Sequence, residues 1–252
     1  MSKNQASYGI IDIGDNMDKI KELKKIIDES NNIVFFGGAG VSTESGIPDF
    51  RSVDGLYNQK YDYPPELILS HDFFFSNTKE FYKFYYDKLI NEDILPNDCH
   101  KKLKELEDQG KLKAIITQNI DGLHEMAGSK NVITLHGSIY RNYCTECIKE
   151  YDLDYMLKFK NKIPKCECGG IIKPDVVLYS EPLDNNDITN SIKYLSEADT
   201  LIIGGTSLTV YPAAGLINYF RGKNLVIINK DPINNNCTLQ INEPIGEVFK
   251  QL

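Results

Sequence analysis

The sequence predicts an α/β fold built on a parallel sheet. Five short apolar runs alternate with segments of helical periodicity, which is typical of strands that are buried on both faces. Each run ends in polar or glycine-rich residues, and parallel sheets bind ligands outside the carboxyl ends of their strands. We therefore expect an enzyme or nucleotide-binding site at this edge. The runs are 33–36, 113–116, 132–135, 200–203 and 225–228.

Length and composition indicate one large domain with an insertion. A chain of 252 residues can bury one substantial core and a small satellite unit. The net charge of −8 argues against a nucleic-acid surface and favours a basic partner, such as a lysine-rich peptide. We expect a cytoplasmic protein, because no leader pattern precedes the first strand and no apolar run is long enough to span a bilayer.

The segment around the first strand carries the most chemistry. An amphipathic helix over 17–27 leads into the strand, which ends in Gly38-Ala39-Gly40. Backbone N–H groups that follow a strand next to a helix start are expected to bind phosphate. Thr43 stands where an ordinary dinucleotide fingerprint has its third glycine. The following Pro48-Asp49-Phe50-Arg51 suits a nucleotide sugar with a leaving aromatic base.

Helical segments separate the remaining strands. The aromatic stretch 57–86, interrupted at Pro64-Pro65, predicts short helices that cap the first turn. The helix after Pro96 carries His100, which we expect to be structural rather than catalytic. Polar residues 117–124 after the second strand are able to bind a ribose or hold a water. The helices that we expect to cover the sheet are 188–195 and 212–220.

The cysteines predict one structural zinc. Cys144 and Cys147 form one pair, and Cys166 and Cys168, followed by two glycines, form a second. Two such pairs supply the four thiolates of a closed tetrahedral site, with no open position for Lewis-acid chemistry. The single residue within the second pair departs from the usual spacing. A nucleic-acid-binding ribbon is the alternative, and the acidic composition counts against it.

Together these motifs resemble the signature of the sirtuins, in their bacterial type, from Phe36 to about Asp231. The resemblance implies a large Rossmann-like domain over 1–55, 94–139 and 174–252. It also implies a smaller inserted unit, made of a helical module over 56–93 and a zinc ribbon over 140–173. The motifs that carry the resemblance are Gly38-Ala39-Gly40 with 48–51, Thr117–Asp121 with His124, His136-Gly137, the cysteine pairs, and Gly205–Leu208 with Asn229.

The resemblance implies an NAD-dependent protein lysine deacetylase that releases nicotinamide and O-acetyl-ADP-ribose. His136 would be the general base, a role that suits an imidazole near neutral pH. Asn119 would order the ribose and a water. The residues implied to hold NAD are Gly38, Ala39, Gly40, Ile47, Asp49, Phe50, Arg51, Gln118, Asn119, Ile120, Asp121, Gly205, Thr206, Ser207, Asn229, Lys230, Asp231 and Ile245.

An acyl-lysine peptide is expected to bind as an added strand between two loops. The residues implied to contact it are Val176, Val177, Tyr179, Ser180 and Glu181. The family's usual Phe-Gly-Glu is here Tyr179-Ser180-Glu181, which adds a side chain where the peptide backbone approaches. Tyr85 stands where family members that remove acidic acyl groups carry an arginine, three residues after Tyr82. This predicts a preference for acetyl or longer neutral acyl groups.

Two alternatives stay open at this point. A mono-ADP-ribosyltransferase on the same scaffold would also release nicotinamide, although the presence of both Asn119 and His136 favours deacylation. A non-catalytic NAD sensor would bind NAD without releasing nicotinamide.

Overall fold

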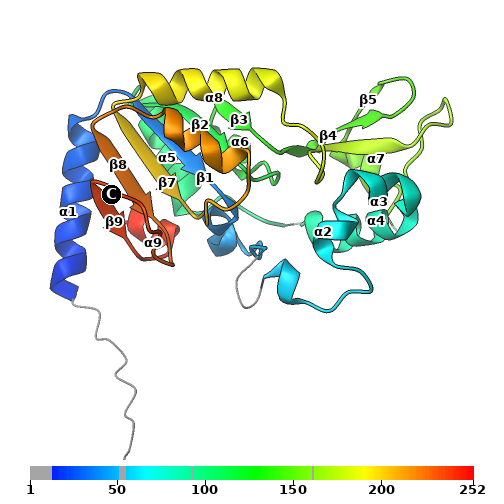
Figure 1. Ribbon diagram of the computed structural model, residues 1–252, viewed down its shortest axis with the longest axis horizontal. Coiled ribbons are helices and arrows are strands. Elements are labelled where there is room, and N and C mark those ends of the chain that lie inside the picture. The colour runs from blue at the N-terminus through cyan, green and yellow to red at the C-terminus, as the bar shows by residue number, and fades with distance from the viewer. Residues whose placement is uncertain (1–12, 51–54, 92, 161) are drawn as a thin grey trace, which may run out of the picture.

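The structure is a computed structural model that describes residues 13–50, 55–91, 93–160 and 162–252. A six-stranded parallel sheet forms its larger part, in the order β3-β2-β1-β7-β8-β9 (Figure 1). The five predicted strands are confirmed, and a sixth short strand, β9, was not predicted. The strands are β1 Ile33–Gly37, β2 Leu112–Thr117, β3 Val132–Thr134, β7 Thr200–Gly204, β8 Asn224–Ile228 and β9 Leu239–Ile241.

The register of the central strands aligns their carboxyl ends. Gly37 of β1 lies opposite Thr117 of β2 on one side and Gly204 of β7 on the other. Gly204 in turn lies opposite Ile228 of β8. The residues that follow these four positions therefore emerge side by side at one edge of the sheet, as the sequence pattern predicts.

Helices cover both faces of the sheet. Helix α1 packs against β9. Helix α5 packs against β2, α6 and α9, whereas α8 packs against β2, β3 and η5. Figure 1 shows α1 along the outer edge beside β9 and α8 running across the sheet. The covering elements are α1 Ile13–Glu29, α5 Asp98–Asp108, α6 Leu123–Met126, α8 Asn185–Glu197, η5 Ala213–Tyr219 and α9 Ile245–Phe249.

Local sequence explains where these helices begin and end. Ile20, Leu23 and Ile27 bury one face of α1, and the backbone N–H of Ser30 closes the helix on Ile26 O. Asn97 caps α5, and the ring of His100 accepts from the Asn97 backbone N–H in a capping box. The structural role expected for His100 is thereby confirmed. The predicted helix over 212–220 forms as a 3-10 helix, η5.

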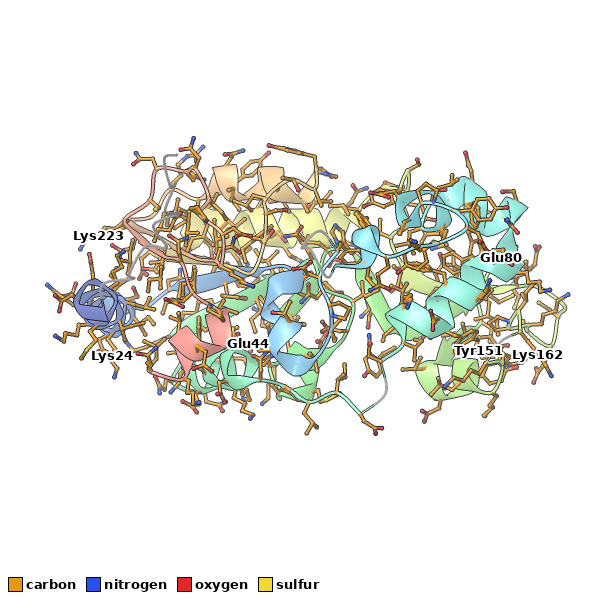
Figure 2. All side chains as sticks on the ribbon, turned by 90° about the horizontal axis from the view of Figure 1, so that it is seen from below. Lys24, Glu44, Glu80, Tyr151, Lys162 and Lys223 are labelled. Carbon is orange, nitrogen blue, oxygen red and sulfur yellow. The ribbon has the colours of Figure 1, made fainter. Side chains whose placement is uncertain are left out.

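A smaller unit contains short helices and an antiparallel three-stranded ribbon. Its elements share one apolar core, to which Phe74, Phe81, Tyr82 and Cys144 all belong. Figure 2 shows Glu80 of α4 and Tyr151 of β5 at the same end of the molecule, opposite Lys24. The elements are α2 Pro65–Ile68, α3 His71–Ser76, α4 Thr78–Phe84, η4 Tyr85–Leu89, β4 Gly137–Cys144, β5 Glu150–Asp152, α7 Leu153–Leu157 and β6 Ile172–Val176.

None of the described helices combines the length with the apolar character that crossing a bilayer requires.

Candidate active site

A cleft of about 1570 Å³ opens at the carboxyl ends of β1, β2, β7 and β8. Each described residue that the sequence analysis assigns to NAD or to the peptide lines this cleft, and so do His136 and Asn119. Arg51 lies outside the described residues. The structure thus brings together side chains that are more than a hundred positions apart in the sequence, while their contacts with ligands stay a prediction.

The glycine turn after β1 is built differently from the expected phosphate cradle. The N–H groups of Gly38 and Gly40 donate to the carbonyls of Gly204 and Gly205, at 3.2 and 2.8 Å. A Cβ on Gly40 would lie 2.8 Å from Gly205 Cα, which real side chains do not tolerate. The helix that follows, η1, covers only Ala39–Val41. These glycines therefore allow two loops to pack together, and two of the N–H groups expected to bind phosphate are already used.

Asn119 is held by a buried network beneath the glycine turn. Its Nδ2 donates to Ser42 Oγ at 3.0 Å, and Ser42 Oγ donates to Asp121 Oδ2 at 2.6 Å. Asp121 Oδ1 accepts from the Leu123 backbone N–H, which begins α6. Burial raises the pKa of Asp121, and the bonds from Ser42 and Leu123 oppose that shift. Asn119 therefore has a defined orientation before any ligand binds, because Ser42 and Asp121 orient its amide.

His136 follows β3 and is half-buried in the wall of the cleft. Its Nδ1 lies 2.9 Å from the carbonyl oxygen of Gln118. A carbonyl only accepts, so Nδ1 carries the proton and Nε2 is free to accept one. Burial lowers the pKa of His136, although the Gln118 carbonyl opposes the shift. The neutral imidazole is therefore the dominant form near pH 7, as a general base requires.

The segment Val176–Glu181 forms one side of the cleft next to His136. The backbone N–H of Val177 donates to His136 O at 3.0 Å. Tyr179 and Ser180 are exposed, and Ser180 has a φ of 73°. Glycine adopts this left-handed conformation without strain, whereas other residues adopt it at a cost of about 1–2 kcal/mol.

Several residues of the cleft wall are not predicted from the sequence. The loop after β7 contributes Leu208, Val210 and Tyr211, and the Tyr211 side chain is 74% exposed. The helical module contributes Tyr57 and Lys88, among others. The loop directly follows Ser207, which is assigned to NAD, and this position in the sequence could have indicated that the loop lines the cleft. For the module, the aromatic stretch predicts short helices over the first turn but not which of their side chains face the cleft, because that follows from packing between distant segments.

Tyr82 and Tyr85 do not line the cleft, which removes the structural basis of the predicted acyl preference. Both side chains are almost fully buried in the core of the smaller unit. The Tyr82 hydroxyl donates to the carbonyl of Ile172, and the Tyr86 hydroxyl donates to that of Met156. These aromatic residues therefore join the helical module to the ribbon and do not shape an acyl tunnel here.

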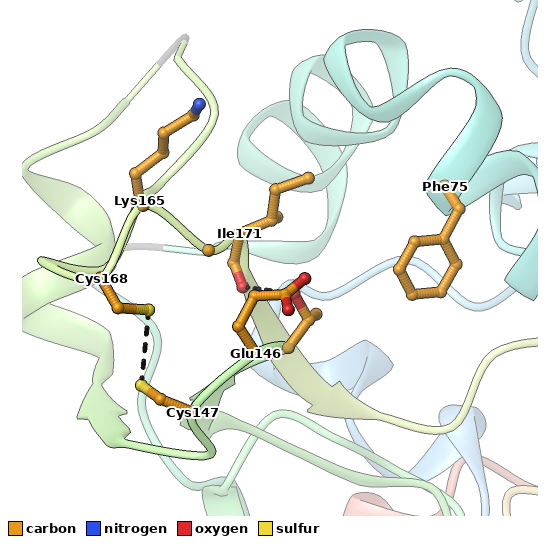
Figure 3. Close-up of a pocket in the computed structure, with 9 residues that line it drawn as sticks. Phe75, Glu146, Cys147, Lys165, Cys168 and Ile171 are labelled. Atoms are coloured by element: carbon orange, nitrogen blue, oxygen red, sulfur yellow. Dashed lines mark hydrogen bonds between the residues drawn. The ribbon is translucent and has the colours of Figure 1, made fainter.

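The four predicted zinc ligands meet in the ribbon. All four sulfur atoms lie within 4.8 Å of one another, and Figure 3 shows Cys147 and Cys168 facing each other. The separations of 3.4 Å for Cys144–Cys168 and 3.6 Å for Cys147–Cys166 are close to the value of about 3.8 Å that tetrahedral bonds of 2.3 Å require. The cluster therefore fits zinc.

The ribbon also supports a thiolate at one ligand. The hydroxyl of Tyr151 donates to Cys166 Sγ at 3.0 Å. This bond, together with the backbone N–H of Cys168 and the neighbouring thiols, lowers the pKa of Cys166 to about 6. Since a metal-bound cysteine is deprotonated, Tyr151 favours the form that binds zinc.

A second hollow of about 660 Å³ lies beside the ribbon (Figure 3). Phe75 and Lys165 line it together with two of the zinc ligands. None of the residues assigned to NAD or to the peptide reaches it. The chemistry therefore belongs to the larger cleft.

Comparison with known proteins agrees with this site. A curated protein from Clostridium acetobutylicum, named NAD-dependent protein deacetylase, is 61% identical over 93% of this chain and 98% of its own length. A Sir2 structure with p53 peptide and NAD+ matches with a TM-score of 0.81 and 38% identity, covering 92% of this chain and 96% of its own.

A further structure holds Sir2 with an inhibitor, 2′-O-acetyl-ADP-ribose and a deacetylated p53 peptide. It matches with a TM-score of 0.80 and 37% identity, over 92% of this chain and 96% of its own. The Sir2 family model covers residues 38–212, which include the glycine turn, Asn119, His136 and the four cysteines. This match, together with the identity to curated relatives, shows that the chain belongs to the Sir2 family.

Proposed function

We propose that the protein is an NAD-dependent protein lysine deacetylase that releases nicotinamide and O-acetyl-ADP-ribose. The observation that carries this proposal is the presence of His136, Asn119 and the segment Val176–Glu181 in one cleft at the carboxyl edge of the sheet. The names of its relatives and the ligands of its structural neighbours support the same reaction.

The cleft residues have separate roles in this reaction. When bound, NAD supplies the ribose that accepts the acetyl group and the nicotinamide that leaves. His136 Nε2 takes a proton from a ribose hydroxyl, because Nδ1 is committed to Gln118 O. Asn119 orders the ribose and a water through an amide that Ser42 holds in place. The glycine turn and the loops after β7 and β8 line the space for the rest of NAD.

The peptide is proposed to add as a strand along Val176–Glu181, facing the loop that carries Val210. Backbone pairing of this kind gives affinity with little demand on the sequence of the substrate. The acidic net charge of −8 favours the approach of lysine-rich segments. We propose acetyl-lysine as the substrate on the basis of the relatives' names and not of Tyr85.

The unit boundaries given by the resemblance also stay part of the proposal. The larger unit, over 1–55, 94–139 and 174–252, would hold NAD. The smaller unit, over 56–93 and 140–173, would carry one structural zinc. A cytoplasmic location is proposed because clustered metal-binding cysteines without disulfides are typical of a reducing compartment, and fractionation of cells that produce the protein tests it.

The test is an incubation of the protein with NAD and an acetyl-lysine peptide. Mass spectrometry should find deacetylated peptide, nicotinamide and O-acetyl-ADP-ribose in equal amounts. His136→Ala should bind NAD as before and lose roughly 10²–10⁴ in rate, the usual contribution of a general base. ADP-ribose attached to the peptide would instead show a mono-ADP-ribosyltransferase, and NAD binding without nicotinamide release would show a sensor.

A further inference from the structure

A lysine is buried beside the segment that is proposed to bind the peptide. Lys173 lies on β6, the ribbon strand that leads into this segment, and its side chain is only 4% exposed. Its ammonium group donates to Val176 O at 2.9 Å and to Glu181 Oε2 at 3.1 Å. A buried ammonium is costly unless its donors are paired. Here they are paired with the two ends of one short segment.

Glu181 is the centre of the contacts at the far end of this segment. Its Oε2 accepts from the Leu178 backbone N–H at 2.8 Å as well as from Lys173. Its Oε1 lies 3.0 Å from His71 Nδ1 in α3. Burial favours the neutral acid, but the bonds from Leu178, His71 and Lys173 outweigh it and hold the pKa of Glu181 below its usual value. The carboxylate is therefore charged and fully engaged.

These contacts join the segment to three other parts of the molecule. Tyr179 exchanges backbone hydrogen bonds with the helical module, donating to Leu69 O at 2.8 Å and accepting from His71 N at 3.0 Å. Lys173 Nζ also lies 6.0 Å from the centre of the Phe74 ring in α3. Val177 donates to the backbone of His136. The ion pair between Lys173 and Glu181 therefore lies where the zinc ribbon, the helical module and His136 come together.

The turn that the ion pair closes is strained. Ser180, with its φ of 73°, directly precedes Glu181. A non-glycine residue keeps such a conformation only where its surroundings impose it. The bond from Leu178 N to Glu181 Oε2 and the bond from Glu181 N to Leu178 O close the turn from both sides. Lys173 in turn fixes the carboxylate that makes the first of them.

We propose that Lys173 and Glu181 are positioning residues that hold Val176–Glu181 ready to pair with the substrate peptide. Neither side chain needs to touch the reacting atoms. Their role is to order the strand before the peptide arrives, so that binding does not have to supply the ordering free energy. This inference rests on the proposed function, because it needs the peptide to bind along this segment.

The test compares Lys173→Met with the parent in steady-state kinetics, well below the melting temperature of either. Methionine keeps the length and apolar stem of lysine but removes the charge. The KM for acetyl-lysine peptide should rise roughly tenfold, the effect of having to order a short turn on binding. The Kd for NAD should stay unchanged. A merely structural role would lower the melting temperature and the active fraction, and would leave the KM for peptide where it was.

Further variants keep the test decisive if Lys173→Met does not fold. Glu181→Gln keeps the shape of the acceptor and should raise the KM for peptide in the same way. Lys173→Arg keeps the cation and should raise it less. In the double variant Lys173→Met/Glu181→Gln the two effects should not add, since both break one contact. Lys83→Met, which removes an exposed lysine paired with Glu80 in the same unit, is the control and should behave as the parent.

The outcomes separate this inference from the proposed function. A parent protein that does not deacetylate the peptide would overturn both. A parent that deacetylates normally, with an unchanged KM for peptide in both Lys173→Met and Glu181→Gln, would overturn only the positioning role. Equal losses of NAD affinity and peptide affinity would also overturn it, because the pair would then be supporting the whole cleft.

Discussion

The imidazole of His136 should give the reaction a characteristic pH dependence. Burial lowers the pKa of His136 below its ordinary 6.5, against the weaker influence of the Gln118 carbonyl. A base must be neutral to act, and a lowered pKa keeps it neutral to more acidic pH. The acidic limb of kcat/KM should therefore lie below pH 6.5. A profile measured between about pH 5 and 8 checks this, with the residual turnover of His136→Ala as the control. A limb centred above 6.5 would contradict it.

Ser180 is a second residue whose surroundings predict a measurable effect. Ser180→Gly should stabilise the protein by about 0.5–1 kcal/mol. Glycine removes a left-handed strain of about 1–2 kcal/mol, and it loses part of that gain through a more flexible unfolded chain. Urea unfolding measures the difference. The same substitution at Ser196, exposed near the end of α8, should destabilise the protein by about 0.5 kcal/mol, the difference in helix propensity between serine and glycine. Destabilisation at both positions would show that the Ser180 turn is not strained.

At the scale of elements, the zinc ribbon and the helical module depend on each other. Cys144 and Cys166 belong to the same apolar core as the aromatic residues of α3 and α4. The hydroxyls of Tyr82 and Tyr86 bond to backbone carbonyls of the ribbon side. Loss of the metal should therefore also loosen the packing of the helices, although they contribute no ligand to it.

Removal of zinc should lower the melting temperature and loosen the helical module together with the ribbon. Structural zinc contributes folding free energy directly. The chain has 15 tyrosines and no tryptophan, so near-ultraviolet circular dichroism reports largely on tyrosines such as those of α4 and η4. A chelator or Cys144→Ser should reduce this signal, whereas Cys237→Ser, outside the cluster, should not. A protein without bound zinc and with unimpaired stability would refute this prediction.

At the scale of the whole molecule, two buried histidines should make the larger unit sensitive to acid. The rings of His100 and His124 lie 4.7 Å apart, and both are fully buried between α5 and α6. Nε2 of His100 and both ring nitrogens of His124 have no hydrogen-bond partner among the described residues. Burial lowers the pKa of His100 to about 4 and that of His124 well below 6.5.

The sign of this effect follows from which state binds more protons. Below pH 6.5 the unfolded chain protonates both imidazoles, while the folded core keeps them neutral. Stability should therefore be fully present above pH 6.5 and fall as the pH drops toward 4, by about 1–3 kcal/mol per pH unit. Urea unfolding of the parent and of His124→Phe at several pH values tests this. The phenylalanine variant should lose less stability in acid, and equal slopes would rule the pair out as the cause.

Local patterns were enough to predict the sheet but not its full width. The five short apolar runs form β1, β2, β3, β7 and β8, because a strand buried on both faces is apolar along its length. The sixth strand, β9, has only three residues with Gln240 at its centre. Such an edge strand forms because β8 offers it a partner, which periodicity within the segment does not reveal.

The candidate site also combines features that local sequence predicts with features that depend on tertiary contacts. Local sequence predicts that glycine turns and polar residues follow the strands, that four cysteines share a ribbon, and that an unusual serine precedes Glu181. These depend on neighbouring residues and on known chemical spacing. Packing between distant segments sets the rest: the N–H groups of Gly38 and Gly40 donate to the carbonyls of Gly204 and Gly205, Tyr82 and Tyr85 lie in a core, and Lys173 is paired with Glu181. Those outcomes depend on contacts between segments far apart in the chain, whose energies arise only once the units have packed.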